Sequence, residues 1–116
     1  MSKIKIKVTL RSENEVSEEE YLAIKTNNKI IYQEKNCMTT LFLDSNLKMV
    51  RSNEETNIEL LFIADKKTTG ICMFNNQILN LELLTDYVVV EEKVIIIKYK
   101  VLTTEQDVLY KMEVIE

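Results

Sequence analysis

Arg51 is a charged residue at a position where the sequence pattern expects a buried side chain. It is the last residue of the run TTLFLDSNLKMVR, residues 39–51. Leu47 and Met49 alternate with polar neighbours, and the same alternation places Arg51 on their apolar face. A guanidinium on a buried face must be paired or must bind an anion such as a carboxylate. If the strand ends first, the side chain instead reaches the rim and keeps its charge in water. The first alternative predicts a site for a small anionic ligand.

Further candidates for such a site are methionines and tyrosines on the apolar faces of expected strands. Methionine adapts its shape to irregular ligands, and tyrosine combines an apolar ring with a polar end. Inside a barrel these side chains would line a cavity, although they would equally well pack a filled core. The candidates are Tyr32, Met49, Met73, Tyr99, Tyr110 and Met112.

Residue types that most enzymes require are missing. The sequence has no histidine, so a Ser-His-Asp arrangement is excluded and the commonest metal ligand is lacking. The only glycine is Gly70, which excludes glycine-rich phosphate loops. Glutamates 18–20 are interpreted as a solvated run, and Cys37 and Cys72 as free thiols without a cationic neighbour. We therefore predict no catalytic residue, no metal and no cofactor.

Composition favours one folded domain spanning residues 1–116. The apolar content of 46% is ordinary for a globular chain, and the net charge of −4 provides no basic field for nucleic acid. The basic face of Lys3, Lys5, Lys7 and Arg11 is interpreted as solubilising. Alternation of lysine and isoleucine at the N-terminus is unlike a signal peptide, and no apolar run approaches the ~20 residues of a membrane span. We expect a cytoplasmic protein with both thiols reduced.

The elements that must position these side chains are predominantly strands. The alternation over residues 3–11 predicts the first strand, and the three-residue loop 44–46 would set Leu43 opposite Leu47 and Thr39 opposite Arg51. Residues 12–20 are expected to be a solvated connection. Two segments, 17–25 and 104–115, also fit a helix, although strands are favoured. Further strands are expected at 19–25, 29–34, 56–63, 68–74, 77–84, 87–90, 94–101 and 108–114, with Asn27-Asn28 and Asn75-Asn76 as turns and a bulge or bend at Thr85-Asp86.

This series of short strands, with turn residues every 8 to 12 positions, is typical of an antiparallel sandwich or barrel. We predict an all-β fold, a single up-and-down antiparallel barrel of about 8–10 strands. The last strand would pair with the first, because closure removes exposed sheet edges.

The runs KIIYQEK, TTLFLDSNLKMVRS, KKTTGICMFNNQILNLELLT and VIIIKYKV together resemble the YwiB-like family of small bacterial proteins. The resemblance extends over nearly the whole chain and implies a calycin-like (lipocalin-like) barrel able to hold a small apolar ligand. It implies no particular ligand or reaction. Ser52-Asn53 stands where the family tends to have a glycine, and Asn75-Asn76-Gln77 replaces a Pro-Tyr-Gly-like turn, so no role of that tyrosine transfers to this chain.

The resulting functional expectation is a non-enzymatic binder of a small apolar or amphipathic ligand inside the barrel. The alternative is a protein-interaction or structural module whose barrel is filled. The predicted ligand-binding residues are Tyr32, Met49, Arg51, Tyr99, Tyr110 and Met112.

Overall fold

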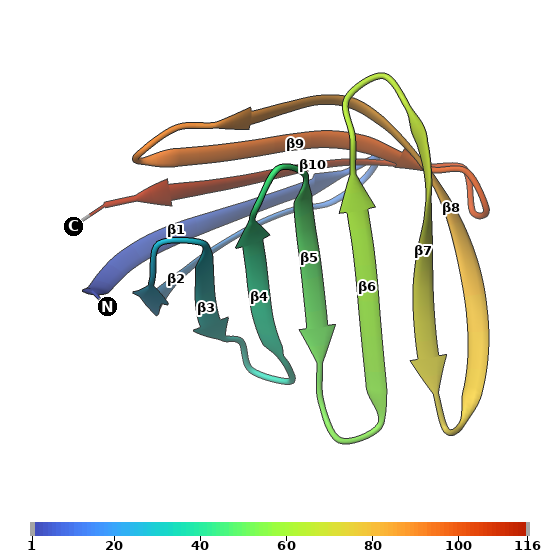
Figure 1. Cartoon of the computed structure of the whole chain (residues 1–116), viewed down its shortest axis with the longest axis horizontal. Coiled ribbons are helices and arrows are strands. Elements are labelled where there is room, and N and C mark those ends of the chain that lie inside the picture. Colours follow the sequence, from blue (N-terminus) through green and yellow to red (C-terminus); the bar gives the residue numbers. More distant parts are fainter. Residues whose placement is uncertain (1, 116) are drawn as a thin grey trace.

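The computed structural model describes residues 2–115, and these form a closed barrel of ten antiparallel strands (Figure 1). Each strand pairs with its neighbours in sequence, and β1 pairs with β10 to close the barrel. The predicted up-and-down order and its closing pair are thus confirmed. The strands are β1 (Ser2–Ser12), β2 (Val16–Lys25), β3 (Lys29–Gln33), β4 (Met38–Leu43), β5 (Leu47–Ser52), β6 (Thr56–Phe62), β7 (Lys67–Phe74), β8 (Gln77–Val90), β9 (Val94–Val101) and β10 (Gln106–Val114).

The two segments whose sequence pattern also fits a helix contain strands in the structure. Residues 17–25 lie within β2, and 104–115 contains β10. The expectation of a solvated connection over 12–20 is wrong in part, because β2 already begins at Val16. Its glutamates are accommodated by cross-strand contacts with β1, where Lys5 lies 3.4 Å from Glu20 and Lys7 lies 3.8 Å from Glu18. Opposite charges at diagonal cross-strand positions make this polar pair of strands compatible with a sheet.

The register predicted for the β4–β5 hairpin is confirmed, with Leu43 opposite Leu47 and Thr39 opposite Arg51. β8 runs through the predicted irregularity, a register shift between Thr85 and Tyr87.

Two asparagine turns behave differently. Asn75 and Asn76 adopt φ values of 49° and 66°, so asparagine here supplies the left-handed conformation that a tight hairpin needs. The turn at Asn27-Asn28 is present between β2 and β3 but is closed by a Thr26 N–H bond to the Lys29 carbonyl, without positive φ at either asparagine.

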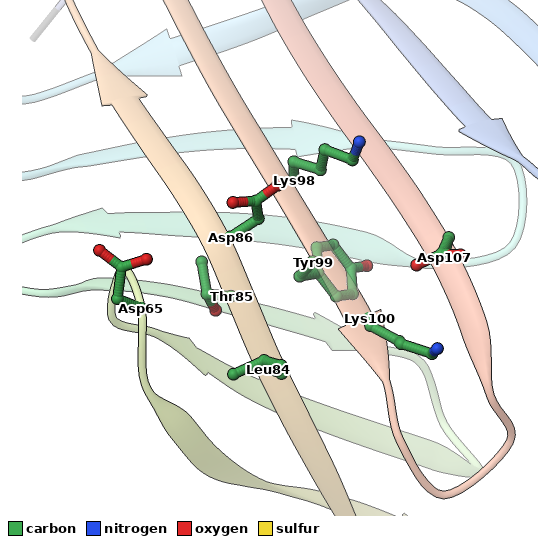
Figure 2. A pocket seen from close by; sticks show the side chains of 8 residues that line it. All are labelled: Asp65, Leu84, Thr85, Asp86, Lys98, Tyr99, Lys100 and Asp107. Atoms are coloured by element: carbon green, nitrogen blue, oxygen red, sulfur yellow. The ribbon is translucent and has the colours of Figure 1, made fainter.

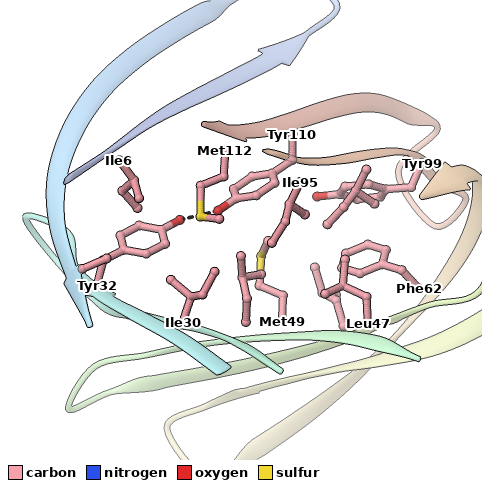
Figure 3. Close-up of a cluster of buried hydrophobic side chains, with 14 of the residues drawn as sticks. Ile6, Ile30, Tyr32, Leu47, Met49, Phe62, Ile95, Tyr99, Tyr110 and Met112 are labelled. Atoms are coloured by element: carbon pink, nitrogen blue, oxygen red, sulfur yellow. Dashed lines mark hydrogen bonds between the residues drawn. The ribbon is translucent and has the colours of Figure 1, made fainter. Parts of the chain in front are cut away.

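The barrel is filled at only one end. Tight packing is concentrated where β2–β3, β4–β5, β6–β7 and β8–β9 are joined, and Figure 3 shows side chains from opposite walls meeting there. Branched and aromatic side chains close this end because alternate residues of every strand point inward. Its most buried members are Ile6, Ile30, Leu41, Phe62, Leu83, Ile95, Ile97 and Met112.

The described residues contain no helix of the length and hydrophobicity that a membrane crossing requires.

Candidate functional site

A cavity of about 470 Å³ occupies the other end of the barrel. It lies where β1–β2, β3–β4, β5–β6, β7–β8 and β9–β10 are joined, and its wall is mostly apolar with tyrosine hydroxyls and a few charges. Cavities of roughly 300–1,000 Å³ with this kind of lining are usual for small-molecule sites. The apolar and aromatic lining is Val8, Leu10, Tyr21, Tyr32, Met49, Ile58, Leu60, Leu81, Tyr99, Val101, Val108 and Tyr110; the polar lining is Ser12, Glu15, Ser17, Glu19, Glu34, Arg51 and Gln106.

Arg51 stands at the mouth of this cavity and is paired. Its Nη2 lies 3.2 Å from Glu34 Oε1 and 3.5 Å from the Cys37 sulfur, and Thr39 donates a hydrogen bond to the other Glu34 oxygen. Desolvation by burial lowers the pKa of Arg51, yet the combined effect of Glu34, Cys37 and Tyr32 outweighs it, so the pKa is raised above its ordinary value. The guanidinium is therefore charged and neutralised by one carboxylate.

One donor of this guanidinium is still available. The Arg51 Nε is buried and makes no hydrogen bond to any described residue. A buried N–H without an acceptor is unfavourable, so this donor is available to a group that offers an oxygen.

A second polar feature lies deeper, between the walls. The hydroxyls of Tyr32 and Tyr110 are 2.7 Å apart, and Figure 3 shows the two rings pointing toward each other from β3 and β10. Burial raises the pKa of Tyr32 and Tyr110 above 10, and raises the pKa of Tyr99 to about 12. All three phenols therefore stay neutral at physiological pH, and each offers a hydroxyl without introducing charge.

The mouth is acidic as a whole. Among the described side chains that line the cavity, Glu15, Glu19 and Glu34 are carboxylates and Arg51 is the one cation. Because Arg51 is already paired with Glu34, the remaining carboxylates set the sign of the local field. This field opposes an anionic group at the entrance.

Comparison with known proteins gives a relationship at the level of fold. No protein-family model and no curated protein matches the sequence significantly. Among solved structures, the chain is similar to the crystal structure of the YwiB protein from Bacillus subtilis, with a TM-score of 0.68 and 16% identity. The match covers 97% of this chain and 92% of that one. The chain has a YwiB-like fold. At this level of identity the likeness establishes the architecture alone.

Within the YwiB-like barrel, most of the candidates predicted from sequence lie at the cavity, and Met112 and Met73 do not. Tyr32, Met49, Arg51, Tyr99 and Tyr110 all line the cavity. Met112 is buried in the filled end and is not part of the lining.

The prediction that Met73 faces inward is wrong, because its side chain is 41% exposed on the outside of β7. The inward face of β7 is the one that carries Gly70, which lies beside Leu60 of the adjacent strand β6, and side chains alternate strictly along a strand.

The residues that sequence reasoning missed are the polar ones at the mouth, Glu34 and Thr39 beside Arg51, and Glu15 and Glu19 on β2 and its preceding turn. Thr39 was detectable, since the predicted register already set it opposite Arg51. Glu34 lies outside the strands, and its contact depends on how the β3–β4 turn folds back. No signal in the sequence specifies that turn.

A second hollow of about 330 Å³ lies on the barrel wall at the β8 irregularity (Figure 2). The loop after β6 packs beside β8 there, with the Asp65 N–H bonded to the Thr85 carbonyl at 2.8 Å. Its lining mixes Asp65, Asp86 and Asp107 with Lys98 and Lys100, so it has no single charge preference. No cluster of potential metal ligands was found among the described residues.

Proposed function

We propose that this protein binds a small apolar or amphipathic molecule in the hollow end of its barrel, without catalysing a reaction on it. The observation that supports this proposal is the cavity itself, which has a volume of about 470 Å³ and a largely apolar wall. The opposite end of the barrel is filled by buried side chains. Burial of apolar ligand surface against such a wall is favourable by about 25 cal/mol per Å² before the costs of association. On this proposal the barrel functions as a calycin-like (lipocalin-like) carrier or sensor in the cytoplasm.

The polar end of the ligand lies beside Arg51 on this proposal. The buried Nε is a donor without an acceptor, and Glu15 and Glu19 stand at the same entrance. An uncharged oxygen, as in an alcohol, ester or amide, accepts from the guanidinium without meeting the field of the carboxylates. The anionic end expected from sequence remains a prediction, but the charges around Arg51 argue against it.

Blocking the cavity tests the proposal. Val108 is on the cavity wall, and Val108→Trp places an indole in the space that the ligand needs. We expect the neutral fluorophore N-phenyl-1-naphthylamine to bind the parent with enhanced emission and to bind Val108→Trp at least about tenfold more weakly, equivalent to about 1.4 kcal/mol.

The matched control is Val16→Trp, the same substitution on an exposed position of β2 that does not line the cavity. It should bind the fluorophore like the parent. Equal binding by all three proteins, or no binding by the parent, would remove the proposal.

Displacement of the fluorophore by competing ligands distinguishes a charged from an uncharged head group. Dodecanol and dodecanoate have the same chain length and differ in charge, so their displacement of the fluorophore compares head groups directly. We expect dodecanol to displace it at lower concentration, because dodecanoate adds a carboxylate beside Glu15 and Glu19. Stronger displacement by dodecanoate would show that Arg51 selects an anion after all.

A further inference from the structure

Two strands extend beyond their neighbours at the open end of the barrel. β8 begins at Gln77 but pairs with β9 only from Leu83, so residues 77–81 are paired with β7 alone. β2 pairs with β3 only from Ala23 to Lys25, so residues 16–22 are paired with β1 alone. Although the barrel is closed, two strand segments at its open end thus have a free edge.

The direction of the backbone groups on β8 follows from Glu82. Its carbonyl accepts from the Leu102 N–H at 2.8 Å, and its N–H donates to Thr103 Oγ1 at 2.9 Å, so Glu82 faces the β9 side. Backbone direction alternates along a strand. Ile78 and Asn80 therefore direct their N–H and C=O groups toward the same side, where no described strand accompanies them.

The two free edges differ in protection. The β2 segment carries Glu18, Glu19 and Glu20 in succession, a charge density that repels a second copy of the same edge. The β8 segment from 77 to 81 has no charged residue, and its Ile78 and Leu79 are 65% and 57% exposed. Phe74 and Met73 of β7 are exposed next to them. An uncharged free edge with apolar side chains on both faces is suited to pairing with another strand.

We propose that a second copy of this chain pairs with β8 edge to edge, antiparallel, about a two-fold axis through Leu79. In this register the N–H and C=O of Ile78 exchange hydrogen bonds with those of Asn80 in the other copy, and the reverse. Every free backbone group of Ile78 and Asn80 then has a partner, and the two Leu79 side chains meet on one face.

This self-complementarity is what favours a second copy over an unrelated strand. Antiparallel pairing of a segment with itself is the isologous arrangement of two-fold dimers. The contact is short, so the association should be weak and depend on concentration.

Sedimentation velocity of the parent over a concentration series tests this pairing. We expect the mean mass to rise from monomer to dimer and no further, because the two-fold contact uses the edge completely. In the same samples, amide exchange at Ile78 and Asn80 should slow as the dimer forms.

Two substitutions should weaken the dimer by about tenfold or more in dissociation constant. Asn80→Pro removes an edge N–H at a position where proline is compatible with an edge strand. Leu79→Lys sets like charges opposite each other at the axis. The matched control is Leu22→Lys, since Leu22 is 78% exposed on the other overhanging strand, and it should dimerise like the parent.

A parent that stays monomeric throughout the series would overturn the proposal. So would folded Asn80→Pro and Leu79→Lys proteins that associate as the parent does, or masses that increase beyond the dimer.

Discussion

At the scale of single residues, Tyr32 and Tyr110 form a buried hydrogen bond that removal of either hydroxyl oxygen would break. Their hydroxyls are 2.7 Å apart in a buried setting, and each ring also forms part of the cavity wall. Arg51 depends in the same way on Glu34, which is its ion partner at the mouth. The alternation of Leu47, Met49 and Arg51 indicated the apolar face for Arg51, because parity follows from strand geometry, but it left open whether the side chain lies inside the barrel or at its rim. Its partner was not predictable, because Glu34 comes from a turn.

The tyrosine pair leads to a prediction about stability. Tyr32→Phe leaves the buried Tyr110 hydroxyl without its partner, and should lower the free energy of unfolding by about 1–2 kcal/mol, as should Tyr110→Phe. The double variant should lose less than the sum of the two, because no hydroxyl is then left unpaired.

Urea unfolding of the four proteins measures this coupling. Tyr87→Phe is the control, since Tyr87 is exposed and should contribute nothing measurable. Strict additivity of the two single losses would show that the hydroxyls do not interact.

At the level of secondary-structure elements, close packing between β7 and its neighbour β6 explains the glycine at position 70. Gly70 points into the barrel, and a Cβ there would approach Leu60 Cδ2 to 2.8 Å and the Glu59 carbonyl oxygen to 3.1 Å. The glycine thus provides space for the Leu60 side chain on the adjacent strand β6. The strands themselves were predicted nearly to their ends, because alternation is a local pattern. The strand ends that lack a partner on one side, in β2 and β8, were not predicted, because the alternation within one strand carries no information about where the neighbouring strand ends.

Replacement of this glycine should affect both stability and binding. Gly70→Ala would ordinarily stabilise a strand, but here it forces Leu60 to move, and Leu60 lines the cavity. We expect a loss of about 1 kcal/mol in the free energy of unfolding together with weaker N-phenyl-1-naphthylamine binding.

Thr69→Ala, at the exposed neighbouring position of β7, is the control for binding and should leave the affinity for the fluorophore unchanged. A Gly70→Ala protein as stable as the parent, with equal affinity for the fluorophore, would contradict the close packing against Leu60.

For the whole molecule, the central property is a barrel filled at one end and hollow at the other. Strand order and closure followed from sequence, because hairpins between successive strands leave few alternatives and closure pairs β1 with β10. The division into a packed and a hollow end did not, because alternation tells which side chains point inward and not how deep they lie. Tyr110 and Met112 illustrate this: both point inward on β10, yet only Tyr110 borders the cavity.

The most direct measurement is a crystal structure of the protein equilibrated with dodecanol. We predict one continuous ligand that extends along Val8 and Val108 and places its hydroxyl within hydrogen-bond distance of Arg51. A cavity that holds only water at saturating dodecanol, or a ligand bound only on the outer surface of the β7–β8 hairpin, would contradict the account.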